Sequence, residues 1–261
     1  MFLPRIIPVL LLRKKGLVKT INFKNPRYIG DPINAVKIFN DLKVDELIFL
    51  DIDATKEERT INVELIKNIG DEAFMPFGVG GGINKIAQAE QLFKAGAEKI
   101  IINTQAILNP KLIEESAKVF GSQSIVVSID IKKSLMGNYF VWIKSGSEKI
   151  DLNPVDAAIK AKELGAGEII INSIDLDGTM QGYDLKLIKS IVDKVSIPVV
   201  ACGGAGNLDH LKEGYFDGKA HALAAGSLFI YHGPRKAVLI NYPTKSEIKK
   251  LFNRELSAYE R

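Results

Sequence analysis

The residue with the clearest chemical potential is Asp130, a carboxylate near the end of the apolar run from Ile125 to Ile131. An uncompensated carboxylate is costly to bury, so we expect it at an exposed active rim or in a hydrogen-bonded role. A general acid/base function is favoured. Asp51 and Asp177 end apolar runs in the same manner, although aspartates at such places can also simply cap turns.

Two glycine-rich turns could bind anions through bare backbone N–H groups that precede a helix. Glycines also occur in tight turns because these need positive φ, so one turn alone would be weak evidence. Here the two turns correspond to each other, and each is backed by the end of the next strand, which predicts a substrate with phosphates at both ends. The candidate phosphate-binding residues are Gly81, Gly82, Asn103, Thr104, Asp177, Gly178, Gly203, Gly204, Gly226 and Ser227.

These residues belong to an internal repeat, in which the second half of the chain resembles the first at an offset of about 120 residues. The segment 46–53 recurs as 168–175, 79–82 as 202–205, and 102–104 as 225–227. The same comparison places 6–12 beside 125–131, so that Asp130 falls opposite Leu11. One half therefore carries an acid or base where the other has an aliphatic side chain.

The elements that position these residues are eight apolar runs, most of them followed by a segment of helical periodicity. This alternation predicts a single α/β domain over residues 1–261, a (β/α)8 TIM barrel with half-barrels at about 1–122 and 123–261, whose active site lies at the C-terminal rim of the strands. The runs begin near Arg5, Glu46, Phe74, Lys99, Ser124, Glu168, Ile197 and His221.

Local signals complete this outline. A capping side chain followed by proline predicts helix starts at Asp31, Asn109 and Asn153. The segment 13–30 is an unusually long first loop that contains Lys19 and is expected to act as a lid. The segment 138–150 is expected to form a hairpin inserted after the fifth strand.

The opposite rim carries charges at the strand starts, namely Arg5, Glu46, Lys99 and Glu168. Two cations and two anions can form a ring in which ion pairs satisfy each other. From spacing alone, this ring is predicted to be a structural plug that closes the bottom of the barrel.

Composition excludes several classes of function. The net charge of +4 comes from lysines and arginines spread among acids, so we expect no nucleic-acid partner. No apolar run approaches the roughly 20 residues of a membrane span, so we expect no membrane association. The single Cys202 fits a reducing cytoplasm, and the three histidines lack metal-ligand spacing, so no metal or cofactor is expected.

Over essentially its whole length the chain resembles the cyclase subunit of imidazole-glycerol-phosphate synthase, the HisF family of histidine biosynthesis. The matching residues are Arg5-Ile6-Ile7-Pro8, Lys19, Gly30-Asp31-Pro32, Asp45-Glu46-Leu47, Asp51-Ile52, Gly80-Gly81-Gly82-Ile83, Ile102-Asn103-Thr104, Gly121-Ser122-Gln123, Ile129-Asp130, Asn172-Ser173-Ile174-Asp175, Asp177-Gly178-Thr179, Gly182-Tyr183-Asp184 and Gly203-Gly204.

The resemblance implies a glutaminase partner of the HisH type that docks on the bottom of the barrel and releases ammonia, which travels through the barrel to a phosphorylated substrate. It implies that the four-charge ring is the ammonia gate, which reverses the interpretation as a plug. It also implies that Glu98 couples the barrel to the glutaminase, and that Lys19 folds over a catalytic Asp130.

The chain departs from the family at one catalytic position. The family uses two aspartates, at the ends of strands one and five, and this sequence has Leu11 and Asp130. Leucine cannot transfer a proton, and loss of one positioned acid or base typically removes about 10²- to 10⁴-fold of rate. Segments such as Leu10-Leu11-Leu12 and Gly226-Ser227-Leu228-Phe229 resemble a paralogous branch associated with acetamidino modification of sugars in surface glycans, together with a sugar amidotransferase.

Our first hypothesis is therefore a glutamine amidotransferase synthase subunit of this sugar-modifying branch, with imidazole-glycerol-phosphate synthesis as the alternative. A second hypothesis is a non-catalytic ammonia conduit that activates a glutaminase. A third, weaker one is a stand-alone sugar-phosphate isomerase, for which the four-charge ring would have no purpose.

Overall fold

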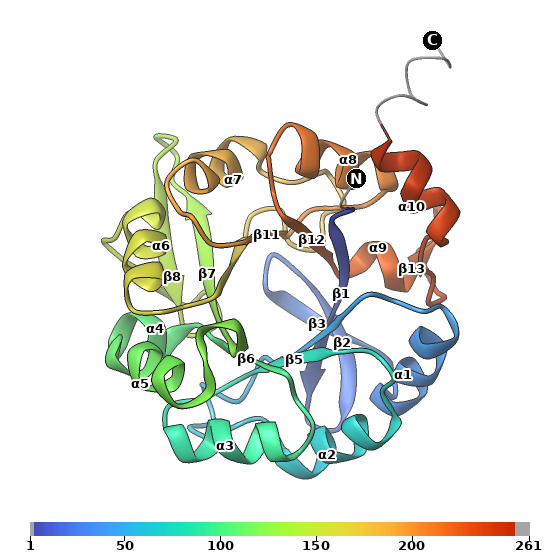
Figure 1. The fold of residues 1–261 in the computed structure, drawn as a ribbon. Helices are drawn as coiled ribbons and strands as arrows, with labels where there is room; N and C mark the ends of the chain where they lie inside the picture. Colours follow the sequence, from blue (N-terminus) through green and yellow to red (C-terminus); the bar gives the residue numbers. More distant parts are fainter. Residues whose placement is uncertain (1–2, 254–261) are drawn as a thin grey trace.

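The computed structural model describes residues 3–253. Within them, eight parallel strands form a closed barrel in the order β1-β4-β5-β6-β7-β10-β11-β12, with β12 paired to β1 (Figure 1). The predicted (β/α)8 barrel is confirmed. The barrel strands are β1 (Arg5–Arg13), β4 (Leu47–Asp51), β5 (Phe77–Gly80), β6 (Lys99–Ile102), β7 (Ile125–Lys133), β10 (Glu168–Ser173), β11 (Val199–Cys202) and β12 (Ala222–Ala225).

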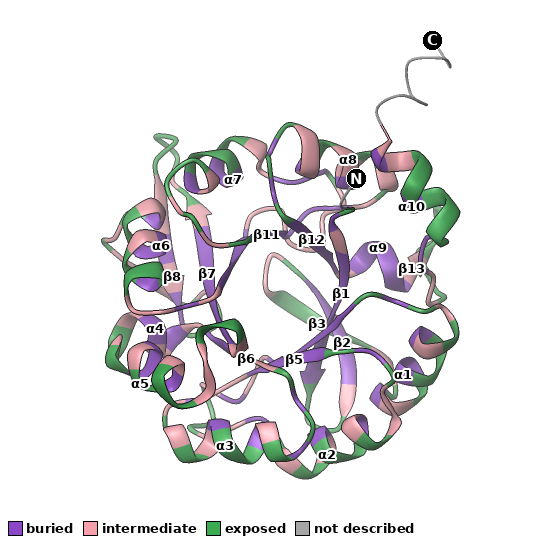
Figure 2. Ribbon diagram, viewed as in Figure 1, coloured by how far each residue is buried: buried purple, intermediate pink, exposed green. Residues whose placement is uncertain are grey.

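Helices surround the strands, and Figure 2 shows that most of them bury their inner faces and expose their outer ones. They are α1 (Pro32–Asp41), α2 (Val63–Glu72), α3 (Ile86–Lys94), α4 (Thr104–Leu108), α5 (Lys111–Phe120), α6 (Pro154–Glu163), α7 (Leu185–Val192), α8 (Leu208–Phe216), α9 (Ser227–Ile230) and α10 (Lys245–Phe252), with a 3-10 turn at Ser122–Ser124 and a two-stranded ribbon of β13 (Tyr231–His232) and β14 (Ala237–Val238).

Alternation along the strands produces two apolar cores. On β7, Val127 and Ile129 pack outward against helices, whereas Val126 packs inward. The inward residues of all the barrel strands fill the interior of the barrel, which we call the lumen. Because side chains of a strand alternate between its two faces, the same rule directs Ser128 and Asp130 into the lumen.

Two hairpins extend the barrel at its C-terminal end. The segment 13–30, predicted as a loop, is in fact an antiparallel ribbon of β2 (Gly16–Ile21) and β3 (Lys24–Gly30), because β1 continues beyond the barrel and pairs with β2. It lies across the barrel opening in Figure 1. The second hairpin, predicted within 138–150, is confirmed as β8 (Tyr139–Ile143) and β9 (Glu148–Ile150), with β8 paired to the outer half of β7.

Some boundaries differ from those predicted from sequence. The third barrel strand begins at Phe77 instead of near Phe74, because the side chain of Asn40 accepts the backbone N–H of Phe74 at 3.0 Å and holds it outside the sheet. The seventh begins at Val199 instead of near Ile197. Asn153 and Asp31 cap helices as predicted, whereas α5 begins after Pro110, and the side chain of Asn109 makes no cap.

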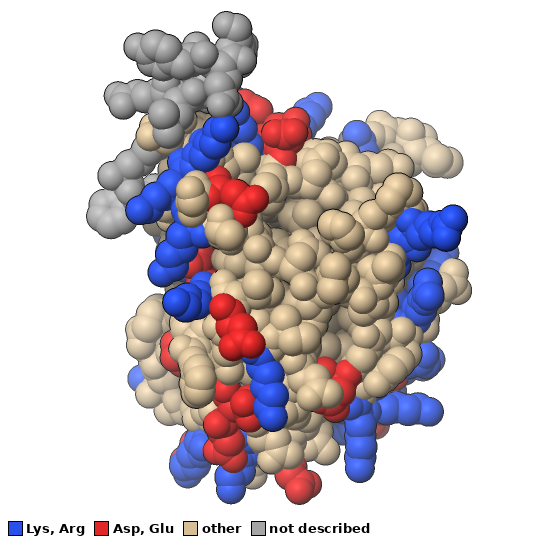
Figure 3. Space-filling view, turned by 90° about the vertical axis from the view of Figure 1, so that its right-hand side faces the viewer, with Lys and Arg blue, Asp and Glu red and all other residues tan. Residues whose placement is uncertain are grey.

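One flank of the molecule agrees with the charge pattern expected from the sequence. Figure 3 shows acidic and basic side chains interspersed on the flank that it presents, with uncharged areas between them. In the part of the chain that the structure describes, none of the helices has the length and apolar character needed to cross a membrane.

Candidate active site

A cavity of about 990 Å³ opens at the C-terminal ends of the barrel strands. Every residue that the sequence predicted as catalytic or phosphate-binding lines it: Lys19, Gly81, Gly82, Asn103, Thr104, Asp130, Asp177, Gly178, Gly203, Gly204, Gly226 and Ser227. Leu11 lines it as well. The fold therefore gathers, at one end of the lumen, residues from both halves of the repeat.

Asp130 lies near the end of β7 with only 7% of its surface exposed. Burial raises the pKa of its carboxyl group to about 7, an effect that the side-chain amides of Asn172 and Asn103 partly oppose. The Asn172 amide donates to Asp130 Oδ1 at 3.3 Å. A carboxyl group that titrates near neutral pH can both accept and return a proton, which suits general acid/base catalysis.

Lys19 reaches the cavity from β2. Its side chain is buried, and burial lowers its pKa, while the nearby carboxylate of Asp177 opposes that change. The ammonium group lies against Gly226, where an added Cβ atom would come within 1.9 Å of Lys19 Nζ. The carboxylate of Asp177 also accepts the Thr20 hydroxyl at 3.1 Å. The cation is thus held at the loop between β12 and α9, on one side of the cavity.

The two glycine turns have the same packing in both halves of the barrel. Gly82 and Gly204 have φ values of +66° and +117°, and an added Cβ would lie 1.8 Å from Arg59 O and 1.9 Å from Gly182 O, respectively. Backbone contact alone therefore requires glycine at these positions. The turns remain candidates for phosphate binding, because they line the cavity next to the starts of α4 and α9.

Leu11 faces the cavity from β1 within an apolar cluster that includes Val9, Val18 and Leu50. Asp51 ends β4, the strand next to β1, and its carboxylate already has hydrogen-bond partners. Its carboxylate accepts Arg59 Nη1 at 2.6 Å and Nη2 at 3.3 Å, and also the backbone N–H groups of the two residues that follow Ile52, each at 3.1 Å. Asp51 is thus a poor substitute for an acid at position 11.

The two hairpins cover the cavity. The side chain of Asn22 donates to the carbonyl groups of Ile174 and Asp175 at 3.1 and 2.6 Å, which fixes the tip of the β2–β3 ribbon to the loop after β10. From the other hairpin, Ser145 Oγ donates to Ile52 O at 3.0 Å. The segment that contains Lys19, expected to be a lid, is therefore an ordered ribbon with specific anchor points.

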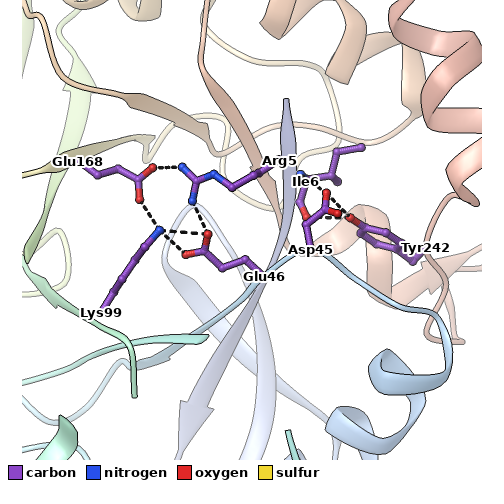
Figure 4. Close-up of polar contacts among 7 residues, drawn as sticks. All are labelled: Arg5, Ile6, Asp45, Glu46, Lys99, Glu168 and Tyr242. Atoms are coloured by element: carbon purple, nitrogen blue, oxygen red, sulfur yellow. Dashed lines mark hydrogen bonds and ion pairs between the residues drawn. The ribbon is translucent and has the colours of Figure 1, made fainter. Parts of the chain in front are cut away.

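The four charged residues at the opposite end form a closed ring of ion pairs (Figure 4). Arg5 binds both Glu46 and Glu168, and Lys99 Nζ lies 2.8 Å from Glu46 and 2.9 Å from Glu168. The two glutamates raise the pKa of Arg5 against the effect of its burial. Glu98, the predicted coupling residue, is exposed beside the ring at the N-terminal end of β6.

Arg5→Met is expected to lower the free energy of unfolding by about 3 kcal/mol, because two buried glutamates lose one of their cations. Removing one partner of a buried ion pair usually costs about 3 to 5 kcal/mol. The lower end of that range applies here, since 35% of the Arg5 side chain is exposed. Urea denaturation measures the change. Arg235→Met, at an exposed turn, is the control, and equal stability of both variants would show that the ring does not contribute.

Sequence reasoning missed two residues of the site, Arg59 and Asn172. Arg59 lies eight residues beyond the aspartate that it binds, and nothing in its neighbourhood in the sequence marks it. Asn172 had a visible signal, because it is a polar residue directly after the apolar run 169–171. Its contact with Asp130 follows from the pairing of β10 with β7.

Comparisons with known proteins agree with one another over most of the chain. Residues 5–234 match the family model described as histidine biosynthesis protein. A protein of Leptospira borgpetersenii, provisionally named imidazole glycerol phosphate synthase subunit HisF, is 50% identical over 97% of this chain and 100% of its own. A Pseudomonas aeruginosa protein, provisionally named subunit hisF2 of that synthase, is 47% identical over 94% and 97%. Imidazole glycerol phosphate synthase subunit HisF of Alkaliphilus metalliredigens is 43% identical over 89% and 92%.

Proposed function

This chain belongs to the HisF family of histidine biosynthesis proteins, and from that premise we propose that it is the synthase-type subunit of a two-component glutamine amidotransferase. A HisH-like glutaminase binds the N-terminal face of the barrel and releases ammonia there. The ammonia passes the ring of Arg5, Glu46, Lys99 and Glu168 and reaches the cavity. The single observation that carries the proposal is that an apolar barrel interior has this closed ring at one end and the cavity containing Asp130 at the other.

Inside the cavity, each group has a separate task. The glycine turns bind phosphate groups of an anionic substrate, and Lys19 neutralises the one nearest Gly226. Asp130 accepts a proton from the nitrogen as it bonds to the substrate and can return it to a leaving group, because its carboxyl group titrates near neutral pH. The ribbon that carries Lys19 covers the reaction and excludes water.

We assign the substrate to the sugar-modifying branch, in which the barrel supplies nitrogen for an acetamidino group on a sugar of a surface glycan, together with a sugar amidotransferase. Leu11 supports this assignment, since one of the two carboxylates used by the cyclase is missing. The engagement of Asp51 with Arg59 supports it further. The alternative is imidazole-glycerol-phosphate synthesis, which is favoured by the name of the Alkaliphilus metalliredigens relative.

The test is whether the chain activates the glutaminase of its own organism. We expect glutamine hydrolysis to accelerate when the barrel is added, and Glu98→Lys to weaken that activation at least about tenfold by reversing a charge on the docking face. Isothermal titration and ammonia release measure the two effects.

Glu115→Lys, which makes the same change at an exposed position on α5, is the matched control and should behave as the wild type. The absence of both binding and activation would overturn the proposal.

A further inference from the structure

One aromatic side chain at the N-terminal rim of the barrel lies in solvent. Phe74 is 88% exposed, whereas every other phenylalanine within 3–253 is buried or half-buried. It follows α2 by two residues and precedes β5, so it lies at the end of the barrel that carries the charged ring. Single exposed apolar residues are common on protein surfaces, but this one is held and surrounded in a particular way.

The backbone of Phe74 is fixed by a side chain from α1. Asn40 Nδ2 donates to Glu72 O at 2.8 Å, and Asn40 Oδ1 accepts the N–H of Phe74 at 3.0 Å. One amide group thus holds both the end of α2 and the loop that follows it. A side chain presented by a fixed backbone loses less conformational freedom on binding, which favours its use as an interface anchor.

The loop that carries Phe74 lies between two other strand starts of this rim. Pro76 O accepts the N–H of Leu47 at 3.1 Å, and the next carbonyl, that of Phe77, accepts the N–H of Glu98 at 3.0 Å. Leu47 directly follows one member of the charged ring, and Glu98 directly precedes another. Phe74 therefore belongs to the face on which the glutaminase is proposed to dock.

Acidic side chains accompany Phe74 at this rim. Asp71 and Glu72 end α2, whose last turn contains no basic residue, and both Asp71 and Glu98 are exposed. Glu72 pairs with Lys37 at 3.8 Å. Carboxylates at the C-terminal end of a helix are repelled by its dipole, so Asp71 and Glu72 do not stabilise α2 through that dipole. Together these carboxylates produce a negative potential that attracts the cationic groups of a partner.

We propose that Phe74 is the aromatic anchor of the glutaminase interface, and that it enters an apolar pocket of the glutaminase whose rim is basic. The inference rests on the proposed function, which supplies the partner. Aromatic side chains that fill such pockets carry much of the binding energy of an interface, whereas charges at its rim chiefly guide association. Phe74 and Glu98 therefore have separate tasks, since Phe74 holds the bound complex together and Glu98 steers its formation.

The test measures association and dissociation rates with the glutaminase of the same organism by surface plasmon resonance. Phe74→Ala should raise Kd at least about thirtyfold, mainly through faster dissociation. Phe74→Leu keeps most of the apolar volume and should recover most of the lost affinity. Glu98→Lys should instead act mainly on the association rate. The melting temperatures of the Phe74 variants should match that of the wild type, because the side chain is exposed.

Leu135→Ala is the matched control, because Leu135 is also fully exposed and lies in the turn between β7 and β8, at the opposite end of the barrel. This variant should bind the glutaminase as the wild type does. Wild-type affinity of Phe74→Ala, or an equal loss of affinity in Leu135→Ala, would overturn the inference. In the first case the barrel still binds and activates its glutaminase, so the proposed function stands. A wild-type barrel that neither binds nor activates the glutaminase would overturn both.

Discussion

Leu11→Asp is expected to create cyclase turnover with ammonia and the bisphosphate substrate of imidazole-glycerol-phosphate synthase, about 10²- to 10⁴-fold above the wild type. The substitution restores a second proton-transfer group on β1, in a cavity that already contains Asp130, Lys19 and both glycine turns. Leu11 lines that cavity, so the new carboxylate can reach the substrate. Product formation under excess ammonium measures the gain without a glutaminase.

Leu11→Asn is the matched control, because its amide has nearly the shape of the carboxylate but cannot accept a proton at neutral pH. Thermal unfolding of both variants separates lost stability from lost chemistry, since each places a polar group beside Val9 and Val18. Wild-type turnover equal to that of Leu11→Asp would favour the histidine alternative. It would mean that the missing carboxylate does not limit the cyclase reaction in this barrel.

The sequence predicts those features of this molecule that arise from local periodicity. Apolar runs such as 100–102 and 169–171 locate the strands, and parallel strands joined by helices necessarily place their C-terminal ends on one rim. Several residues of the cavity lining, such as Asp130 and Gly203, could therefore be predicted from their places after the strands. The first charged residue of several strands could likewise be placed at the other rim, where Arg5 and Glu168 indeed meet.

Features that depend on partners across the sheet could not be predicted from the sequence. The ribbon 16–30 is continuous with β1 through pairs such as Leu11 with Val18, and its turn contains non-glycine residues with positive φ, Asn22 and Phe23, where glycine would be the usual signal. The engagement of Asp51 by Arg59 and the contact of Asn172 with Asp130 likewise depend on which groups the folded chain brings together.

Asp130→Asn is expected to reduce the activity of the assembled amidotransferase pathway by about 10²- to 10⁴-fold. In the wild type, we expect activity to rise with pH through about 7, because the base form appears as Asp130 ionises. The variant should lose this inflection. Nitrogen transfer to the acceptor sugar, measured with the glutaminase present, tests both effects. Unchanged activity would instead support the non-catalytic conduit, in which the barrel only activates the glutaminase and passes ammonia on.

The same substitution should stabilise the protein, which separates a catalytic defect from misfolding. The pKa of the Asp130 carboxyl group is about 7 in the folded protein, against an ordinary value of 3.8 for an aspartate in water. Between these values the folded state binds more protons than the unfolded chain, so this residue makes stability fall as pH rises from about 4 to 7, by up to roughly 4 kcal/mol.

The Asp130→Asn variant lacks that loss of stability. Its melting temperature should therefore exceed that of the wild type more at pH 8 than at pH 5, whereas Asp41→Asn, at an exposed position, should show no such difference. If the variant is less stable than the wild type at pH 8, the hydrogen bonds of the buried carboxylate compensate for its burial. Asp130 would then not lower the stability of the protein.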